Sequence, residues 1–86
     1  MRTIHNYPLY VGKSIECWLP AGAKVLKVDR QGQALCLWAE IEDSAPFERR
    51  LFSVFGTGHA MPDHVPLTFI DTVFDGSYVW HVYEQT

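Results

Sequence analysis

The sequence predicts a single all-β domain, a small antiparallel barrel or sandwich of about six to seven strands. Turn-forming residues recur about every eight to twelve residues, and no segment shows a sustained apolar period of 3.6 residues. Asp75-Gly76, a strong hairpin signal, separates two runs rich in β-branched and aromatic residues. The 86 residues have the length of one domain only, residues 1–86.

The N-terminal half is expected to contribute four strands. Residues 2–10 are rich in β-formers, and Pro8 places them at a sheet edge because proline cannot donate a ladder hydrogen bond. Residues 13–20 alternate apolar with polar side chains before a Pro-Ala-Gly-Ala turn. Residues 24–28 and 34–42 are expected to pair as a hairpin, with a glycine between them that supplies positive φ.

Residues 34–42 carry one clean apolar face, which predicts a half-buried strand. This face consists of Leu35, Leu37, Ala39 and Ile41.

The C-terminal half adds a strand over residues 47–56 and a hairpin of residues 67–74 with 77–84. Both faces of this hairpin are apolar, so both should be covered. We expect one face to pack on the core and the other on a second copy of the chain in a homo-oligomer, with Trp80 and Val82 at the interface. The alternative is that the long loop of residues 56–66 folds over the second face.

Composition excludes several classes of protein. A net charge of −3 argues against a duplex nucleic-acid binder, which needs a basic face. No apolar run approaches the roughly 18 residues of a membrane span, and the N-terminus lacks the apolar core of a signal peptide. We therefore expect a cytoplasmic protein with no membrane partner, no cofactor, and free thiols at Cys17 and Cys36.

Four stretches together resemble a family of small uncharacterised proteins encoded by tailed phages and prophages. They are "IHNYPLY", "LPAGAKVLKVDRQGQALCLWAEIE", "ERRLFSVFGTGHAMP" and "YVWHVYE", of which "FGTGH" and "VWHV" are the most specific parts. Relatives tend to carry a glycine where this chain has Asp71. The resemblance implies a phage accessory protein made in an infected bacterial cell, and it assigns no functional residue.

The loop "FGTGHAMPDH" holds the most chemically suggestive residues of the chain. Its two glycines and threonine can present successive backbone N–H groups and a hydroxyl to an anion, with a histidine as a further donor and two arginines one strand length upstream. Strand alternation lets only one arginine face a given pocket. Alternatively, the glycines simply form a bulge and a turn. The candidate ligand-binding residues are Arg49, Arg50, Gly56, Thr57, Gly58 and His59.

Metal binding and catalysis are weaker interpretations. A metal site would draw on His59, Asp63, His64 and His81, but their spacing fits no established ligand pattern, so no metal ligand is predicted. A nucleophile would need Thr57, Ser53 or Ser77 beside His59 or His81, and no catalytic signature surrounds them. We therefore predict no catalytic residue.

The three tryptophans are most simply core or interface residues. One of them near the arginine pair would favour a nucleotide-like ligand, because an indole ring can stack on a base. They are Trp18, Trp38 and Trp80.

The leading hypothesis is a non-enzymatic binding protein, a phage β-barrel oligomer that sequesters a small anionic, nucleotide-like host immune signal. A second hypothesis is a protein-interaction module that inhibits a host factor or serves phage assembly, through the acidic stretch "AEIEDSAPFE" or the apolar hairpin face. The third is a small metal-dependent hydrolase built on His59, Asp63 and His64.

Overall fold

The computed structural model describes all residues, 1–86, and contains seven strands and no helix. The all-β prediction is confirmed. No helix is present that could cross a membrane. The strands are β1 (Arg2–Leu9), β2 (Gly12–Pro20), β3 (Lys24–Gln31), β4 (Ala34–Glu42), β5 (Phe47–Gly56), β6 (Leu67–Asp75) and β7 (Tyr78–Gln85).

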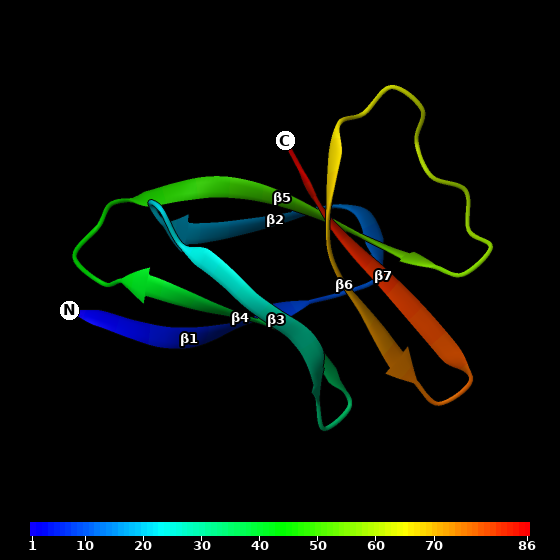
Figure 1. Cartoon of the computed structure of the whole chain (residues 1–86), viewed down its shortest axis with the longest axis horizontal. Helices are drawn as coiled ribbons and strands as arrows, with labels where there is room; N and C mark the ends of the chain where they lie inside the picture. The colour runs from blue at the N-terminus through cyan, green and yellow to red at the C-terminus, as the bar shows by residue number, and fades with distance from the viewer.

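The strands form two antiparallel sheets in a sandwich-like arrangement rather than a closed barrel (Figure 1). One sheet has the order β1-β4-β3, and the other has the order β2-β5-β7-β6. The first strand lies at an edge, as Pro8 predicted, and both predicted hairpins, β3 with β4 and β6 with β7, are formed.

The core lies between the two sheets and is built by alternation along the strands. On β4, Leu37, Ala39 and Ile41 are buried, and Leu35 packs against them, which confirms the predicted face. Both cysteines are free and buried. The remaining buried core residues are Leu9, Ile15, Cys17, Leu19, Ala23, Val28, Phe52, Val54, Val73 and Val82.

The C-terminal hairpin does not use the face that was predicted for a partner. Val82 is fully buried and Trp80 packs against the core, so neither side chain is free to contact a second chain through an outward face. The interface assignment of Val82 is therefore wrong. Because successive residues of a strand point to opposite sides, the outward side chains of β7 are those of Val79, His81 and Tyr83.

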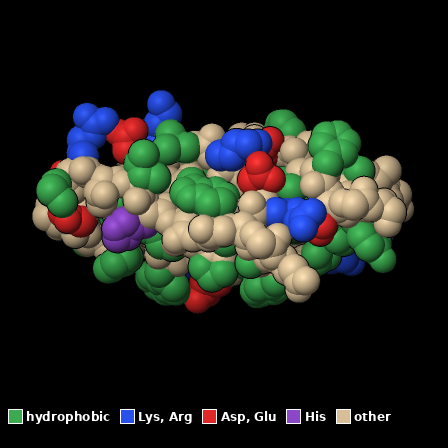
Figure 2. All heavy atoms as spheres, turned by 90° about the horizontal axis from the view of Figure 1, so that it is seen from below, with side chains coloured by type: hydrophobic (Ala, Val, Ile, Leu, Met, Phe, Trp, Pro, Cys, Tyr) green, Lys and Arg blue, Asp and Glu red, His purple; other side chains and the backbone are tan.

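The long loop after β5 also departs from the alternative expectation. Nine of its ten residues, 57–66, are exposed, and the loop projects away from the sheets (Figure 1). It does not cover the outer face of the hairpin, where Phe69 and Phe74 remain 56% and 75% exposed. The body is thin, with extents of 40 × 33 × 15 Å, and hydrophobic side chains stand along its surface in edge view (Figure 2).

A carboxylate joins the two sheets where their edge strands β3 and β6 meet. The register of β3 shifts between Val25 and Lys27, and that of β6 shifts between Phe69 and Asp71. One Asp71 oxygen, Oδ2, accepts hydrogen bonds from Lys27 Nζ at 2.9 Å and from the Val28 N–H at 3.1 Å. A bulge on each strand thus brings side chain and backbone together across the seam.

The ionised form of Asp71 is the one that holds the seam. Burial raises the pKa of this carboxyl, but hydrogen bonds from Lys27, Val28 and Thr72 outweigh burial and leave the pKa below its ordinary value of 3.8. A pKa that is lower in the folded than in the unfolded chain stabilises the fold above the unfolded value. That contribution is lost as the pH falls through the folded-state pKa.

We expect Asp71→Asn to lower the free energy of unfolding at pH 7 by about 1–3 kcal/mol, because an amide replaces an acceptor of charge-assisted hydrogen bonds. Urea denaturation followed by tryptophan fluorescence measures this difference. The gap between wild type and variant should shrink below about pH 4 as the wild-type carboxyl is protonated. Asp63→Asn, in the exposed loop, is the control and should leave the midpoint unchanged; equal midpoints for both variants would contradict the role of Asp71.

Candidate functional site

The paired arginines diverge and neither reaches the glycine loop. Arg49 lies on the surface, where its Nε donates to Glu16 Oε2 at 2.6 Å. Arg50 is only 17% exposed and closes one end of the core. It is six residues from Gly56, which is about 20 Å along an extended strand. The structure therefore does not bring Arg49 or Arg50 to the predicted anion site.

Arg50 is instead a structural residue. Its Nε and Nη2 donate to the two carboxylate oxygens of Glu84, each at 2.7 Å, and Nη1 donates to the Ala23 carbonyl at 2.6 Å. The guanidinium also lies 5.8 Å from the centre of the Phe52 ring. The hydrogen bonds with Glu84 raise the pKa of Arg50 above its ordinary value. This side chain ties β5 and β7 to the β2–β3 turn.

The backbone of the glycine loop does not form the predicted cradle of successive donors. The Thr57 N–H donates to the Val79 carbonyl at 3.2 Å, and the His59 N–H donates to the Gly56 carbonyl at 3.0 Å. Gly58 has a φ of +86°, which glycine adopts without strain, and it turns the chain. Two of the three amides are therefore used inside the protein, and the Gly58 N–H is the remaining donor.

His59 folds back over the end of β5. The Gly56 N–H donates to His59 Nδ1 at 3.1 Å, so a neutral imidazole carries its proton on Nε2. The ring meets the Trp80 ring edge-on, with centroids 6.4 Å apart and an interplanar angle of 62°. A Cβ at Gly56 would lie 2.8 Å from the His59 ring, so glycine is required for this close approach.

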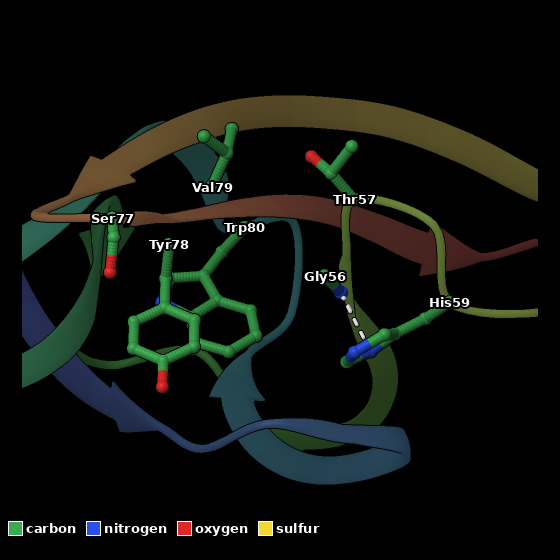
Figure 3. A pocket seen from close by; sticks show the side chains of 7 residues that line it. All are labelled: Gly56, Thr57, His59, Ser77, Tyr78, Val79 and Trp80. Carbon is green, nitrogen blue, oxygen red and sulfur yellow. Dashed lines mark hydrogen bonds between the residues drawn. The ribbon is translucent and has the colours of Figure 1, made fainter.

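A cavity of about 430 Å³ opens beside His59, and rings form one wall of it. Tyr78 and Trp80 stack with centroids 5.5 Å apart and planes 6° apart. In Figure 3 these two rings lie together, with Gly56 and His59 facing them from the end of β5. The lining residues are Gly56, Thr57, His59, Ser77, Tyr78, Val79 and Trp80.

An ion pair between Arg30 and Asp75 lies beside Trp80 at the rim of the cavity. The indole Nε1–H donates to Asp75 Oδ2 at 3.3 Å, and the other oxygen of Asp75 lies 3.0 Å from Arg30 Nη1. This contact fixes the Trp80 ring and leaves no unpaired charge at that edge. The cavity is therefore an aromatic pocket with neutral polar groups at its margin.

Register explains why the pocket was only partly anticipated. Gly56, Thr57 and His59 were named from the loop, whereas Tyr78 and Trp80 join them because β7 pairs with β5 so that Gly56 lies opposite Trp80. The hairpin turn Gly76-Ser77, with Asp75 opposite Tyr78, sets only the register of β7 with β6. The Asp-Gly signal was visible in the sequence, but the pairing of β7 with β5 was not.

On the opposite side of β7, the structure assembles one of the hydroxyl–imidazole pairs considered from the sequence. Thr57 Oγ1 lies 2.8 Å from His81 Nε2, and Thr72 Oγ1 lies 3.2 Å from His81 Nδ1. In a catalytic triad a carboxylate binds the second nitrogen of the histidine and stabilises the imidazolium. In this structure the Thr72 hydroxyl occupies that position. This arrangement satisfies the ring nitrogens without activating a nucleophile strongly.

The other candidates remain apart. No group of three or more His, Cys, Asp or Glu side chains is placed to hold a metal ion. His59 and His81 lie on opposite sides of β7, while Asp63 and His64 are exposed in the loop. Of the tryptophans, only Trp80 lines the pocket.

A second hollow, on the other sheet, is lined by Arg2, Thr3, Ile4 and Glu40 and contains one hydrophobic residue.

The comparisons place the chain in a family without giving it a function. Residues 1–86 match the model of a family described as a domain of unknown function, DUF7352. The chain belongs to that family. Searches of curated proteins and of solved structures found no match. What this DUF7352 domain does therefore has to be argued from its pocket and its surfaces.

The two arginines offer a matched test of the structural assignment. Arg50→Ala should lower the free energy of unfolding by about 2–4 kcal/mol. The substitution leaves the partly buried Glu84 carboxylate and the Ala23 carbonyl without their hydrogen-bond donor. Arg49→Ala should change it by less than about 0.5 kcal/mol, since its partner is in water. Urea denaturation of both variants measures the difference. Similar losses for the two variants would contradict the assignment.

Proposed function

We propose that this domain is a non-enzymatic binding protein whose pocket holds a small ligand with a flat aromatic ring, of the nucleotide type. The observation that carries the proposal is the wall of stacked Tyr78 and Trp80 rings beside His59. The cavity volume of about 430 Å³ falls within the range of small-molecule sites. Stacking on aromatic side chains is the common way in which proteins hold bases without reading their sequence.

The polar groups at the pocket are suited to an anionic substituent on such a ring. His59 Nε2 is the protonated nitrogen of the neutral imidazole, because Nδ1 already accepts the Gly56 N–H. The Ser77 hydroxyl is a further donor among the lining residues, whereas Gly58 is not one of them. This donor set replaces the arginines that the sequence offered for the role.

Binding without chemical change is favoured by the same geometry. Thr57, whose hydroxyl lies 2.8 Å from His81 Nε2, projects to the other side of β7 from the Tyr78 and Trp80 rings (Figure 3). The imidazole that does line the pocket, His59, accepts the Gly56 N–H at Nδ1, so its neutral form turns a proton donor rather than a base to a bound ring. No metal-binding cluster offers an activated water instead.

The resemblance to small phage proteins suggests the biological ligand class to test. In an infected bacterium, a binding protein without turnover acts by sequestration, and nucleotide-type immune signals of the host are small, flat and anionic. We therefore propose an anti-defence role in the cytoplasm of the infected cell as the biological form of this function.

Calorimetric titration with nucleobases and with mono-, di- and cyclic nucleotides tests the proposal. We expect at least one to bind, and Tyr78→Ala to weaken that binding by about ten- to a hundredfold, as loss of one stacking ring does. Tyr78 is 63% exposed, so the variant should fold normally. Gly56→Ala should weaken binding as well, because the new methyl group displaces the His59 ring.

Phe47→Ala is the matched control, because Phe47 is a 66% exposed aromatic residue at the opposite end of β5. It should bind as the wild type does. Chromatography of the recovered ligand should show it unchanged. Absence of binding across the panel would overturn the proposal in favour of a protein-interaction module, and a cleaved product would overturn it in favour of an enzyme.

The protein-interaction alternative retains support from one observation. Phe69 and Phe74 are exposed on the outer face of the last hairpin, where large apolar side chains mark contact surfaces. The acidic stretch offers less, because Glu42 already accepts hydrogen bonds from the Ser44 hydroxyl and backbone.

A further inference from the structure

The outer face of the β6–β7 hairpin carries a continuous strip of side chains without a single Lys, Arg, Asp or Glu. Phe74 pairs with Val79 across the two strands, Thr72 with His81, and Phe69 with Tyr83. The Phe69 and Tyr83 rings meet edge-on at 5.5 Å, and Tyr83 also contacts the buried Phe55 ring at 6.0 Å. We call this surface the outer strip; it consists of Phe69, Thr72, Phe74, Val79, His81 and Tyr83.

The polar members of the outer strip are already satisfied within the chain. His81 Nε2 pairs with Thr57 Oγ1 at 2.8 Å, and His81 Nδ1 pairs with Thr72 Oγ1 at 3.2 Å. Removing water from a polar group is costly only when it is left without a partner. A partner can therefore exclude water from the strip without leaving the imidazole of His81 unpaired.

The chain has a reason to gain stability from covering this surface. Only 18 of its 86 residues are buried, which is a small core for a domain of this length. Phe69 and Phe74, 56% and 75% exposed, leave on the order of 250 Å² of ring surface in water. Together with their neighbours in the strip, these two rings would form the apolar centre of an interface. A standard interface buries about 800 Å² of each partner.

We propose that a second copy of the chain covers the outer strip, and that the protein is a dimer packed face to face through its β6–β7 hairpins. In a twofold-symmetric interface a side chain close to the symmetry axis lies near its own counterpart, so an unpaired charge there would meet a like charge. The uncharged strip avoids this although the whole chain carries a net charge of −3. At the edge of the same face, Arg49 is already neutralised by Glu16.

The proposed dimer leaves the aromatic wall of the ligand pocket free, and Val79 is the one residue of the outer strip that also lines the pocket. Tyr78 and Trp80 lie on the opposite side of β7 from Val79, His81 and Tyr83, because strand residues alternate. Two sheets packed face to face are separated by about 10 Å, the usual spacing of sandwich layers. The arrangement would turn the two-layer body into a stack with the four-stranded sheets at its centre and both pockets accessible.

Analytical ultracentrifugation from about 1 µM to high micromolar concentration tests the dimer. The wild type should approach twice its mass of 9.9 kDa. Phe74→Lys should raise the dimer dissociation constant about a hundredfold or more, because an ammonium group then replaces a ring in the apolar interface of each protomer. Phe69→Lys, at the other end of the strip, should act in the same direction and guards against a local effect of one substitution.

Ile4→Lys is the matched control, because Ile4 is 56% exposed, like Phe69, but lies on the other sheet beside Glu40. It should leave the dimer intact, and circular dichroism should show all three variants folded. A monomer across the whole concentration range would overturn the proposal. A dimer that survives both Phe74→Lys and Phe69→Lys would overturn it as well, as would capture of the strip by a different protein while the chain itself stays monomeric.

Discussion

The Asp71 carboxylate binds both a side chain and a backbone N–H of the facing edge strand, and so supplements the apolar core in joining two sheets that share no ladder hydrogen bonds. It receives the Lys27 ammonium and the Val28 N–H from the edge of the three-stranded sheet. Both edge strands carry a register shift at this place. A glycine at this position would have no side chain to make this connection.

At the other end of the core, Arg50 performs a comparable task by a different route. Its planar guanidinium matches the Glu84 carboxylate with two parallel hydrogen bonds and reaches the Ala23 carbonyl with a third. A core of only 18 buried residues leaves its ends near water, and polar side chains with fixed partners close those ends. The thin body is therefore framed by two charged residues, one at a seam and one at an end.

Local signals predicted the elements well and their assembly less well. The positive φ of Gly32 and Gly76, the edge position of Pro8 and the alternation of Leu37 and Ala39 were readable because each depends on neighbours in the sequence. Which strand pairs with which depends on contacts far along the chain, and no alternation reveals it. For this reason the inward and outward sides of the last hairpin were assigned the wrong way round.

The candidate site shows the same division. The loop residues Gly56, Thr57 and His59 were recognised from their chemistry, and they do line the pocket. The arginines were placed there because they are close in sequence, although a strand carries its residues away at about 3.3 Å each. Trp80 and Tyr78 could have been found only by anticipating that Gly56 lies opposite Trp80.

The excursion of residues 57–66 is anchored at both of its ends. The Thr57 N–H is bonded to the Val79 carbonyl, and the Pro66 carbonyl accepts the Thr86 N–H. Between these two hydrogen bonds nine of the ten residues are exposed, and the contacts with β7 are made at the start of the loop, by Thr57 and His59. Lengthening such a segment costs only about 0.6 kcal/mol for each doubling of its length. The loop should therefore tolerate an inserted peptide. Such a peptide would lie beside the mouth of the pocket, and the sandwich would keep its fold.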